Sequence, residues 1–231
     1  MKTDSFCFNF SLPAPLLNQQ IFAIRFDAST LSPADLLVLP HHQQLQKAVV
    51  SRQAEHVAGR LMARDALLHL GVQATIPAIG SHRQPLWPEN VMGSISHNRY
   101  IALATVAKMS GEGLEGIGID IESLIESDRV TEVVDGIIGA TEYAVLNSSS
   151  LSFEIALTLV FSAKESLFKA LFAHVGTWFD FSAAHIESIS PLTQKFTLRL
   201  VEPLSPILPA GLLFEGQWRW LDNNIVTFIR V

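Results

Sequence analysis

Hydrophobic residues recur at helical spacing in two long stretches of the chain. The first runs from His41 to Leu70 without a proline, and its apolar positions, among them Leu45 and Leu61, return every three or four residues. This pattern predicts an amphipathic helix, and Gly71, which follows directly, is a typical C-terminal stop. The second stretch, Phe153 to Phe172, predicts another long helix.

Short apolar runs bounded by turn residues predict the strands. The runs "GSIS" and "YIALATVA" are separated by "HNR" and indicate a β-hairpin. "GIGIDIES", Gly116 to Ser123, predicts a further strand, and "KFTLRLVEP", "GLLFEGQWRW" and "IVTFIRV" predict antiparallel strands near the C-terminus. Residues 1–40 contain several prolines and suit one short strand around Ile21 to Phe26, with loops. Residues 124–150 are polar and mixed, and suit a short helix and an exposed loop.

The order of these elements predicts an α+β protein of two similar halves. Each half would have a long helix packed on a small, mostly antiparallel sheet, and a pseudo-twofold axis would relate the two. The glycine-rich segment 111–118 is the natural boundary, which divides the chain into residues 1–115 and 116–231. No repeat in the sequence demonstrates a duplication.

Composition narrows the class of protein. The chain has 231 residues, 48% of them hydrophobic, which is enough for a sizeable core. Its net charge of −6 argues against a nucleic-acid binder, so an anionic ligand would have to meet a local cluster of Lys and Arg. A single cysteine, Cys7, no signal peptide and no charge-free window of about 20 apolar residues favour a cytoplasmic protein, which we expect to be a monomer. The apolar composition is also compatible with weak membrane adhesion.

Two carboxylates stand in the otherwise apolar strand "GIGIDIES". Side chains alternate along a strand, so Asp120 and Glu122 share one face, about 7 Å apart at Cα, and the isoleucines can enter a core from the other. Like charges at this distance need a cation, a proton or full solvation. An edge strand with solvated acids is an equally good interpretation of this segment alone.

The second long helix supplies a third acid. In "FSAKESLFKAL", Glu165 and Lys169 lie four residues apart on one helical face, as in an ordinary surface ion pair. Phe161 and Phe168 place them in apolar surroundings, where an unpaired charge is costly. Glu165 brought against the two strand acids would complete a three-carboxylate site for a hard cation such as Mg²⁺.

Together these motifs resemble the 4′-phosphopantetheinyl transferases of the surfactin synthetase type. "GRLMARDAL", "RQPLWP" and "GSISHN" are similar to the enterobactin synthase component D branch in particular, and the resemblance extends over residues 50–172. It implies that magnesium and coenzyme A bind between two similar halves, and that a carrier-protein serine attacks the pantetheine-side phosphorus. The products would be a holo carrier protein and adenosine 3′,5′-bisphosphate, in siderophore (enterobactin-like) or other non-ribosomal peptide synthesis.

The resemblance also assigns roles to the acids. Asp120, Glu122 and Glu165 are similar to the family's metal ligands. Glu165 is the candidate general base, directly or through a water, and Lys169 would stabilise charge on the leaving phosphate. Asp120, Glu165 and Lys169 are therefore expected at the coenzyme A phosphates as well.

Basic and hydroxyl side chains of the first half are the expected coenzyme A contacts. Arg52 and Arg60 are eight residues apart on the first helix, about 12 Å along its axis, and suit separate phosphates, although solvated arginines are common. Ser96 and His97 would stand at the hairpin turn and meet a phosphate there. His82 is expected to contact a phosphate too, although relatives commonly carry lysine at this position.

Three other residues keep more than one interpretation each. Trp87 suits adenine, carrier protein or core. Lys164 suits a phosphate or the solvated side of the helix, and Glu142 suits an acid near the metal, a helix cap or a solvated position.

Two other functions fit parts of the pattern. A metal-dependent phosphodiesterase acting on a nucleotide would use the same acids with an activated water. A carrier-protein binding module without catalysis would need neither the acids nor Lys169, and their joint presence argues against it.

Overall fold

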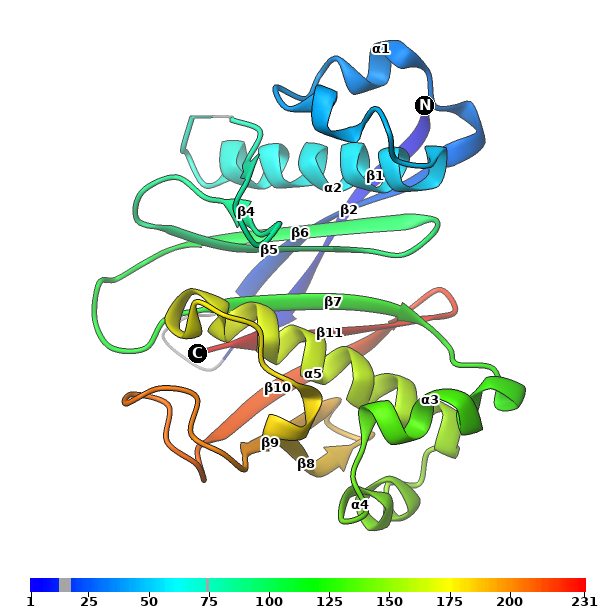
Figure 1. Cartoon of the computed structure of the whole chain (residues 1–231), viewed down its shortest axis with the longest axis vertical. Coiled ribbons are helices and arrows are strands. Elements are labelled where there is room, and N and C mark those ends of the chain that lie inside the picture. The colour runs from blue at the N-terminus through cyan, green and yellow to red at the C-terminus, as the bar shows by residue number, and fades with distance from the viewer. Residues whose placement is uncertain (13–17, 74) are drawn as a thin grey trace. The chain divides into compact units, whose positions relative to one another are not determined.

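The computed structural model describes residues 1–12, 18–73 and 75–231, and in them the chain forms two compact units, Met1–Glu112 and Gly113–Val231 (Figure 1). Both units are α+β, with a long helix against an antiparallel sheet, so the predicted fold class is confirmed. None of the described helices is long and apolar enough to cross a membrane.

Unit 1 is built on a four-stranded antiparallel sheet. Its order is β1 (Lys2–Ser11), β2 (Asn18–Asp27), β6 (Ile101–Lys108) and β5 (Val91–His97). Helix α2 (Val50–His69) lies on this sheet (Figure 1). Small side chains such as Ala54 and Ala58 meet Ala102 and Ala104 in a fully buried cluster, which lets the helix approach the strands closely. Minor elements are η1 (Ala28–Thr30), α1 (Pro33–Leu36), η2 (His42–Leu45), β3 (Ala78–Ile79) and β4 (Pro85–Leu86).

The N-terminal segment corrects the sequence prediction. Two ten-residue strands, β1 and β2, stand where one short strand was expected. The missed signal is the alternation of Phe6, Phe8 and Phe10, whose neighbouring ring centroids lie 6.4 and 6.0 Å apart. Part of the proline-containing loop expected here, residues 13–17, lies outside the described residues.

The first long helix begins at Val50 instead of His41. Val49 has an extended backbone, with φ −63° and ψ 153°, so the helix cannot continue toward the N-terminus. The Gln53 side-chain amide donates to the carbonyls of Leu45 and Ala48 and holds the preceding turn in place. At the other end the chain turns at Gly71 with φ +76°, as the sequence predicted.

Unit 2 has a five-stranded antiparallel sheet and four helical segments around one long helix. The sheet order is β7 (Ile117–Ser123), β11 (Asn224–Arg230), β10 (Leu213–Leu221), β9 (Lys195–Leu200) and β8 (Ala184–Ser190). Helix α5 (Phe153–Val175) packs on it, and η3 (Ser127–Arg129), α3 (Val130–Ile137), α4 (Glu142–Ser148) and η4 (Phe181–Ala183) complete the unit (Figure 1). The predicted strands are confirmed. Strand β8 and the second of the two helices within residues 124–150 were not predicted.

Candidate active site

The acidic face of β7 is turned toward helix α5. A Cβ atom at Gly118 would overlap the backbone carbonyl of Ser166, and one at Gly116 would overlap that of Ala170. Two residues of strand span about 6.6 Å and four of helix 6 Å, so this matching continues from one pair to the next. The next pair on the same face is Asp120 with Ser162, which are in contact. The two glycines thus bring the helix close enough for the acids to meet its side chains.

Asp120 is buried and held at both carboxylate oxygens. Only 2% of the residue is exposed. Lys169 Nζ donates to Oδ1 at 2.6 Å and Ser162 Oγ donates to Oδ2 at 2.8 Å. Lys169 also donates to the Ile119 carbonyl at 3.2 Å. A solvated edge acid is therefore the wrong interpretation for Asp120.

A chain of buried hydroxyls continues behind Asp120. Ser162 gives its single proton to the carboxylate, so in its 2.9 Å contact with Thr227 the proton comes from Thr227 Oγ1. Thr227 is then the acceptor in its 2.7 Å contact with Ser166 Oγ. Ser162, Ser166 and Thr227 are fully buried, and Thr227 faces Asp120 across the β7–β11 pair. All three hydroxyls therefore donate in one direction, toward Asp120, and polarise one another.

The other two acids, Glu122 and Glu165, are close enough to Asp120 for its charge to raise their pKa values. Burial and the charge of Asp120 raise the pKa of Glu122 to about 8. Burial also raises the pKa of Glu165, with Lys169 lowering it and Asp120 raising it further. Among the described residues, no three His, Cys, Asp or Glu side chains stand as a formed metal site. Their chemistry nevertheless fits a hard cation, since carboxylates that burial and mutual repulsion disfavour are stabilised by a positive charge.

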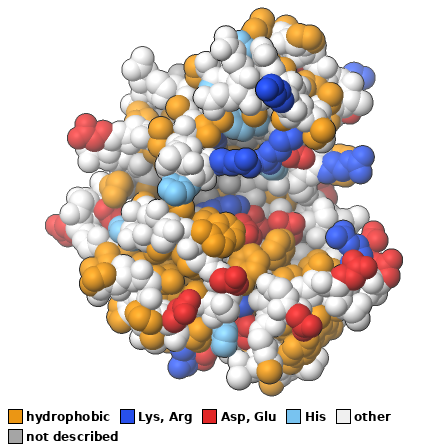
Figure 2. Space-filling model, viewed as in Figure 1, with side chains coloured by type: hydrophobic (Ala, Val, Ile, Leu, Met, Phe, Trp, Pro, Cys, Tyr) orange, Lys and Arg blue, Asp and Glu red, His pale blue; other side chains and the backbone are white. Residues whose placement is uncertain are grey.

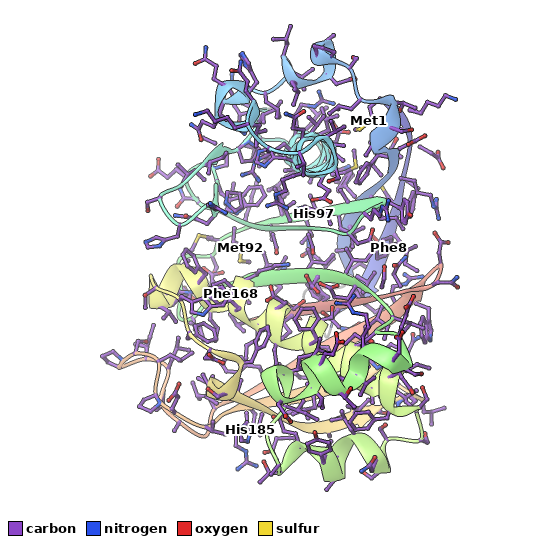
Figure 3. The ribbon with its side chains drawn as sticks, turned by 45° about the vertical axis from the view of Figure 1, so that its right-hand side comes forward. Met1, Phe8, Met92, His97, Phe168 and His185 are labelled. Atoms are coloured by element: carbon purple, nitrogen blue, oxygen red, sulfur yellow. The ribbon has the colours of Figure 1, made fainter. Side chains whose placement is uncertain are left out.

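Aromatic rings surround this face of α5. The Phe168 ring lies 5.5 Å from Phe172, 4.6 Å from Trp178 and 5.1 Å from Phe179, measured between centroids (Figure 3). Phe161 packs edge-to-face on Phe181 at 5.6 Å. The apolar setting expected from the phenylalanines in the motif is present on the helix that carries Glu165 and Lys169, and both of these residues are partly buried.

Lys164 and Glu142 form a buried ion pair, which contradicts a solvated position for either residue. Lys164 Nζ lies 2.9 Å from Glu142 Oε1 and also donates to the carbonyls of Ile137 and Phe181. Glu142 accepts from the backbone N–H groups of Gly139 and Ile186. With 2% and 1% of their side chains exposed, neither reaches a solvated ligand. Both residues are structural, because these bonds hold α4, β8 and α5 together.

In unit 1, Arg52 and His97 are brought together. Arg52 Nη1 lies 2.8 Å from His97 Nε2 and 3.3 Å from Glu55 Oε2. An arginine can only donate, so His97 accepts at Nε2 and carries its proton on Nδ1, 3.6 Å from Glu55. Figure 3 shows His97 at the end of β5, near α2. The arginine is half-exposed and remains available to an anion.

Arg60 is a buried arginine, so the solvated interpretation is wrong for it. Only 5% of the residue is exposed, and burial together with Arg52 lowers its pKa to about 10. Its Nη2 donates weakly to the Ala78 carbonyl at 3.5 Å. Its Nε has no hydrogen-bond partner among the residues that the structure describes. A buried donor without a partner is costly, which fits a site for an anion.

The remaining expected contacts are spread over β5 and the loop before it. Ser96 and His97 are the last residues of β5, paired with Leu103 and Ala102, so they precede the turn in which they were expected. Asn98 makes that turn, because its Oδ1 accepts from the N–H groups of Tyr100 and Ile101.

His82 and Trp87 lie in or beside the loop between β3 and β4. His82 is exposed, and its N–H donates to the Gln84 side chain. Trp87 packs on Gly93 within the apolar clusters of unit 1, which is the core interpretation.

Five residues near the predicted ones were missed. Ser162, Ser166 and Thr227 lie behind Asp120, and His41 and His56 lie beside Arg60. For three of these residues the sequence held a signal. Ser162 and Ser166 stand four residues apart, on one face of a predicted helix, and His56 lies midway between Arg52 and Arg60.

The comparison with protein families accounts for both units. The family model for the 4′-phosphopantetheinyl transferase N-terminal domain matches residues 41–107. The model for the 4′-phosphopantetheinyl transferase superfamily matches residues 116–212. Enterobactin synthase component D of Salmonella typhi is 39% identical over 217 residues, covering 94% of this chain and 88% of that protein. The chain belongs to the 4′-phosphopantetheinyl transferase superfamily. The resemblance inferred from the motifs is thereby confirmed.

Two other relatives of this phosphopantetheinyl transferase are similar over much of its length. Enterobactin synthase component D of Escherichia coli (strain K12) is 44% identical over 156 residues, 68% of this chain and 72% of that protein. The 4′-phosphopantetheinyl transferase Svp of Streptomyces mobaraensis is 30% identical over 201 residues, 86% of this chain and 80% of that protein. The similarity therefore includes both the enterobactin synthase branch and transferases outside it.

Proposed function

We propose that this transferase moves 4′-phosphopantetheine from coenzyme A to a serine of apo carrier proteins in siderophore or other non-ribosomal peptide synthesis. The observation that carries the proposal is the buried acid and lysine face of unit 2, where Asp120 contacts Lys169 beside Glu122 and Glu165. A phosphopantetheinyl transferase must neutralise the charge that develops on the phosphates, and this face would supply the groups that do so.

The reaction breaks the phosphoanhydride bond of coenzyme A. The serine oxygen forms a bond to the pantetheine-side phosphorus, and adenosine 3′,5′-bisphosphate leaves with the electron pair. Such transfer depends mainly on positioning and on charge neutralisation. Lys169 neutralises charge on the phosphates, and Glu165 accepts the serine proton, directly or through a water. Its raised pKa brings Glu165 closer to the range in which a carboxylate is an efficient base.

Magnesium would be held by Asp120, Glu122 and Glu165, and it would supply positive charge to the phosphate oxygens. The support is chemical: three acids whose pKa values or positions reflect burial and mutual proximity, on one strand and one helix. Ser162 and Lys169 orient the Asp120 carboxylate from behind and from the side.

Residues 1–115 would bind the coenzyme A phosphates, and residues 116–231 would hold the metal and the reacting groups. Arg52, Arg60, His82, Ser96 and His97 are the proposed contacts of the first half. The burial of Arg60 with an unpartnered Nε, among the described residues, and the exposure of Arg52 beside His97 support this assignment. In Figure 2, Lys and Arg side chains gather on the part of the face that unit 1 contributes, with histidines beside them.

The test is incubation with coenzyme A and an apo carrier protein, followed by intact mass. An added phosphopantetheine supports the proposal; free cleavage products would indicate a phosphodiesterase, and no reaction a binding module. Asp120→Ala, Glu122→Ala and Glu165→Ala should each slow transfer by at least about 10²-fold. Glu215→Ala, an exposed acid paired with Lys195, is the control and should behave as wild type.

Coenzyme A affinity tests the arginines separately. Arg52→Ala should weaken it about ten- to a hundred-fold, the loss of one charge-assisted contact of roughly 1.5–3 kcal/mol. The exposed Arg199, paired with Glu187, provides the matched control in Arg199→Ala. Equal dissociation constants for the two variants would make Arg52 a surface residue.

A further inference from the structure

Helix α2 presents three basic side chains on one face. Arg52, His56 and Arg60 are spaced by four residues, so each follows the last by about 6 Å along the helix axis. His56 therefore occupies the middle of the line formed by the two arginines. The function proposed above gives it no role.

His56 makes a close contact with a second unassigned histidine, His41. Their Nε2 atoms lie 2.8 Å apart, and the rings meet edge-to-face with centroids 5.1 Å apart. Only one proton can occupy that contact, so one ring donates and the other accepts. His41 is 9% exposed, and its Nδ1 has no hydrogen-bond partner among the described residues. Two buried nitrogens, His41 Nδ1 and Arg60 Nε, are thus left without a protein partner in the part of the chain that is described.

The surroundings of this pair are cationic. Arg60, Arg52 and His97 act on His56, and Arg60 and His42 act on His41. The carboxylate in this group is Glu55, which contacts Arg52 and His97. Burial, together with these charges, lowers the pKa of His56 to about 3 and also lowers that of His41. Both imidazoles are neutral at pH 7, and an anion would reverse the shift.

We propose that His41, His56 and Arg60 form a binding site for a phosphate monoester, and that the histidine pair takes up one proton from solvent when the dianion binds. The proton makes His41 an imidazolium whose Nε2–H donates to His56 and whose Nδ1–H donates to the phosphate. The 2.8 Å contact is kept and the unpartnered nitrogen is satisfied. A phosphomonoester suits the site because it carries up to two negative charges, with a second pKa near 6.

The inference rests on the proposed function only for the identity of the ligand. Of the phosphates of coenzyme A, the 3′-phosphate is the monoester, and the bridging phosphates carry one charge each. The pair would therefore determine specificity by favouring donors that carry this group. Adenosine 3′,5′-bisphosphate is a suitable probe, and adenosine 5′-monophosphate is the matched ligand without the 3′-phosphate.

Calorimetry at pH 7.5 in two buffers of different ionisation enthalpy measures proton uptake and affinity together. Wild-type protein should take up protons with the bisphosphate and take up fewer with the monophosphate. His41→Gln should bind the bisphosphate about ten-fold more weakly, with most of the extra uptake gone, and bind the monophosphate within about two-fold of wild type. His69→Gln, an exposed histidine near the end of the same helix, is the control and should match wild type.

A variant that fails to fold is recognised by circular dichroism, and His56→Gln then replaces it. Ring-nitrogen NMR of the wild type decides independently of any variant, because the bisphosphate should move one histidine ring, that of His41, toward the imidazolium position. Unchanged rings, undiminished uptake in both variants, or equal loss of affinity for both ligands would overturn the inference. Transfer to a carrier protein without proton uptake leaves the proposed function standing, whereas uptake without transfer leaves the phosphate site standing.

Discussion

At the scale of single residues, the candidate site depends on how Asp120 is held. Its two carboxylate oxygens accept hydrogen bonds from Lys169 and Ser162. Ser162 is the last of three buried hydroxyls that all donate toward the carboxylate. A chain that donates in one direction strengthens its last bond. The carboxylate is thereby held in one orientation by its hydrogen bonds.

Ser162→Ala tests this arrangement. It removes the donor to Asp120 and leaves the Thr227 hydroxyl without its acceptor, so magnesium affinity and transfer rate should each fall by about 10- to 100-fold. Ser166→Ala, one step further along the chain, should have a smaller effect. The measurements are magnesium titration by calorimetry and transfer rates at saturating metal. Equal effects of the two substitutions would show that the hydroxyls only fill the core.

At the scale of elements, Gly118 in β7 and Gly116 directly before the strand decide how close α5 can lie. Gly116 and Gly118 occupy the strand face that meets the helix backbone, and Asp120 continues that face. A larger side chain would push the helix outward and separate Asp120 from Ser162 and Lys169. The geometry of the acids therefore depends directly on how closely α5 packs against β7.

Gly118→Ala should destabilise the protein by about 1–3 kcal/mol, since its Cβ would overlap the carbonyl of Ser166. Gly136→Ala in α3, where a Cβ meets nothing within 4 Å, should be neutral or stabilise by up to about 1 kcal/mol. Urea unfolding followed by circular dichroism compares the two. Equal stability would mean that α5 shifts without cost.

The pair Lys164 and Glu142 acts at the same scale by joining α5, α4 and β8. Lys164→Met leaves a buried carboxylate without its cation and should cost about 3–5 kcal/mol. The double variant Lys164→Met with Glu142→Gln should regain part of this loss, because the neutral amide is less costly to bury. Thermal midpoints measure both. If the double variant loses more stability than the two single variants lose when their losses are added, the pairing is contradicted.

At the scale of the whole molecule, the charge is divided unevenly. Residues 1–112 carry nine Lys and Arg against seven Asp and Glu, which leaves seven against fifteen in residues 113–231. The overall charge of −6 is therefore the sum of a slightly basic unit and a strongly acidic unit. This division suits a phosphate-binding unit and a unit that holds a cation.

As the pH falls, the protein should begin to lose stability at a higher pH than protonation of its carboxylates alone would cause. The folded-state pKa of His56 is about 3, below the ordinary value of 6.5, so the unfolded chain takes up a proton first as pH falls through 6.5. This histidine costs no stability above that pH and destabilises progressively below it. His56→Gln should lose less stability between pH 7 and 4.5 than wild type does, as urea midpoints at several pH values will show. Parallel curves would mean that His56 protonates freely in the folded protein.

Local hydrophobic patterns were enough to predict the fold class, the strands of both sheets except β1 and β8, and the acid and lysine motifs, because period-two and period-3.6 patterns report which face of an element is buried. The environment of the charges, in contrast, depends on tertiary packing. Lys164 pairs with Glu142 in the core and Ser162 reaches Asp120, and each of these contacts joins residues more than 20 positions apart. Arg60 is buried and contacts Ala78, which lies beyond its own helix. A local pattern records a side chain's own preference for water, and burial of a charge depends on the partner that folding brings to it.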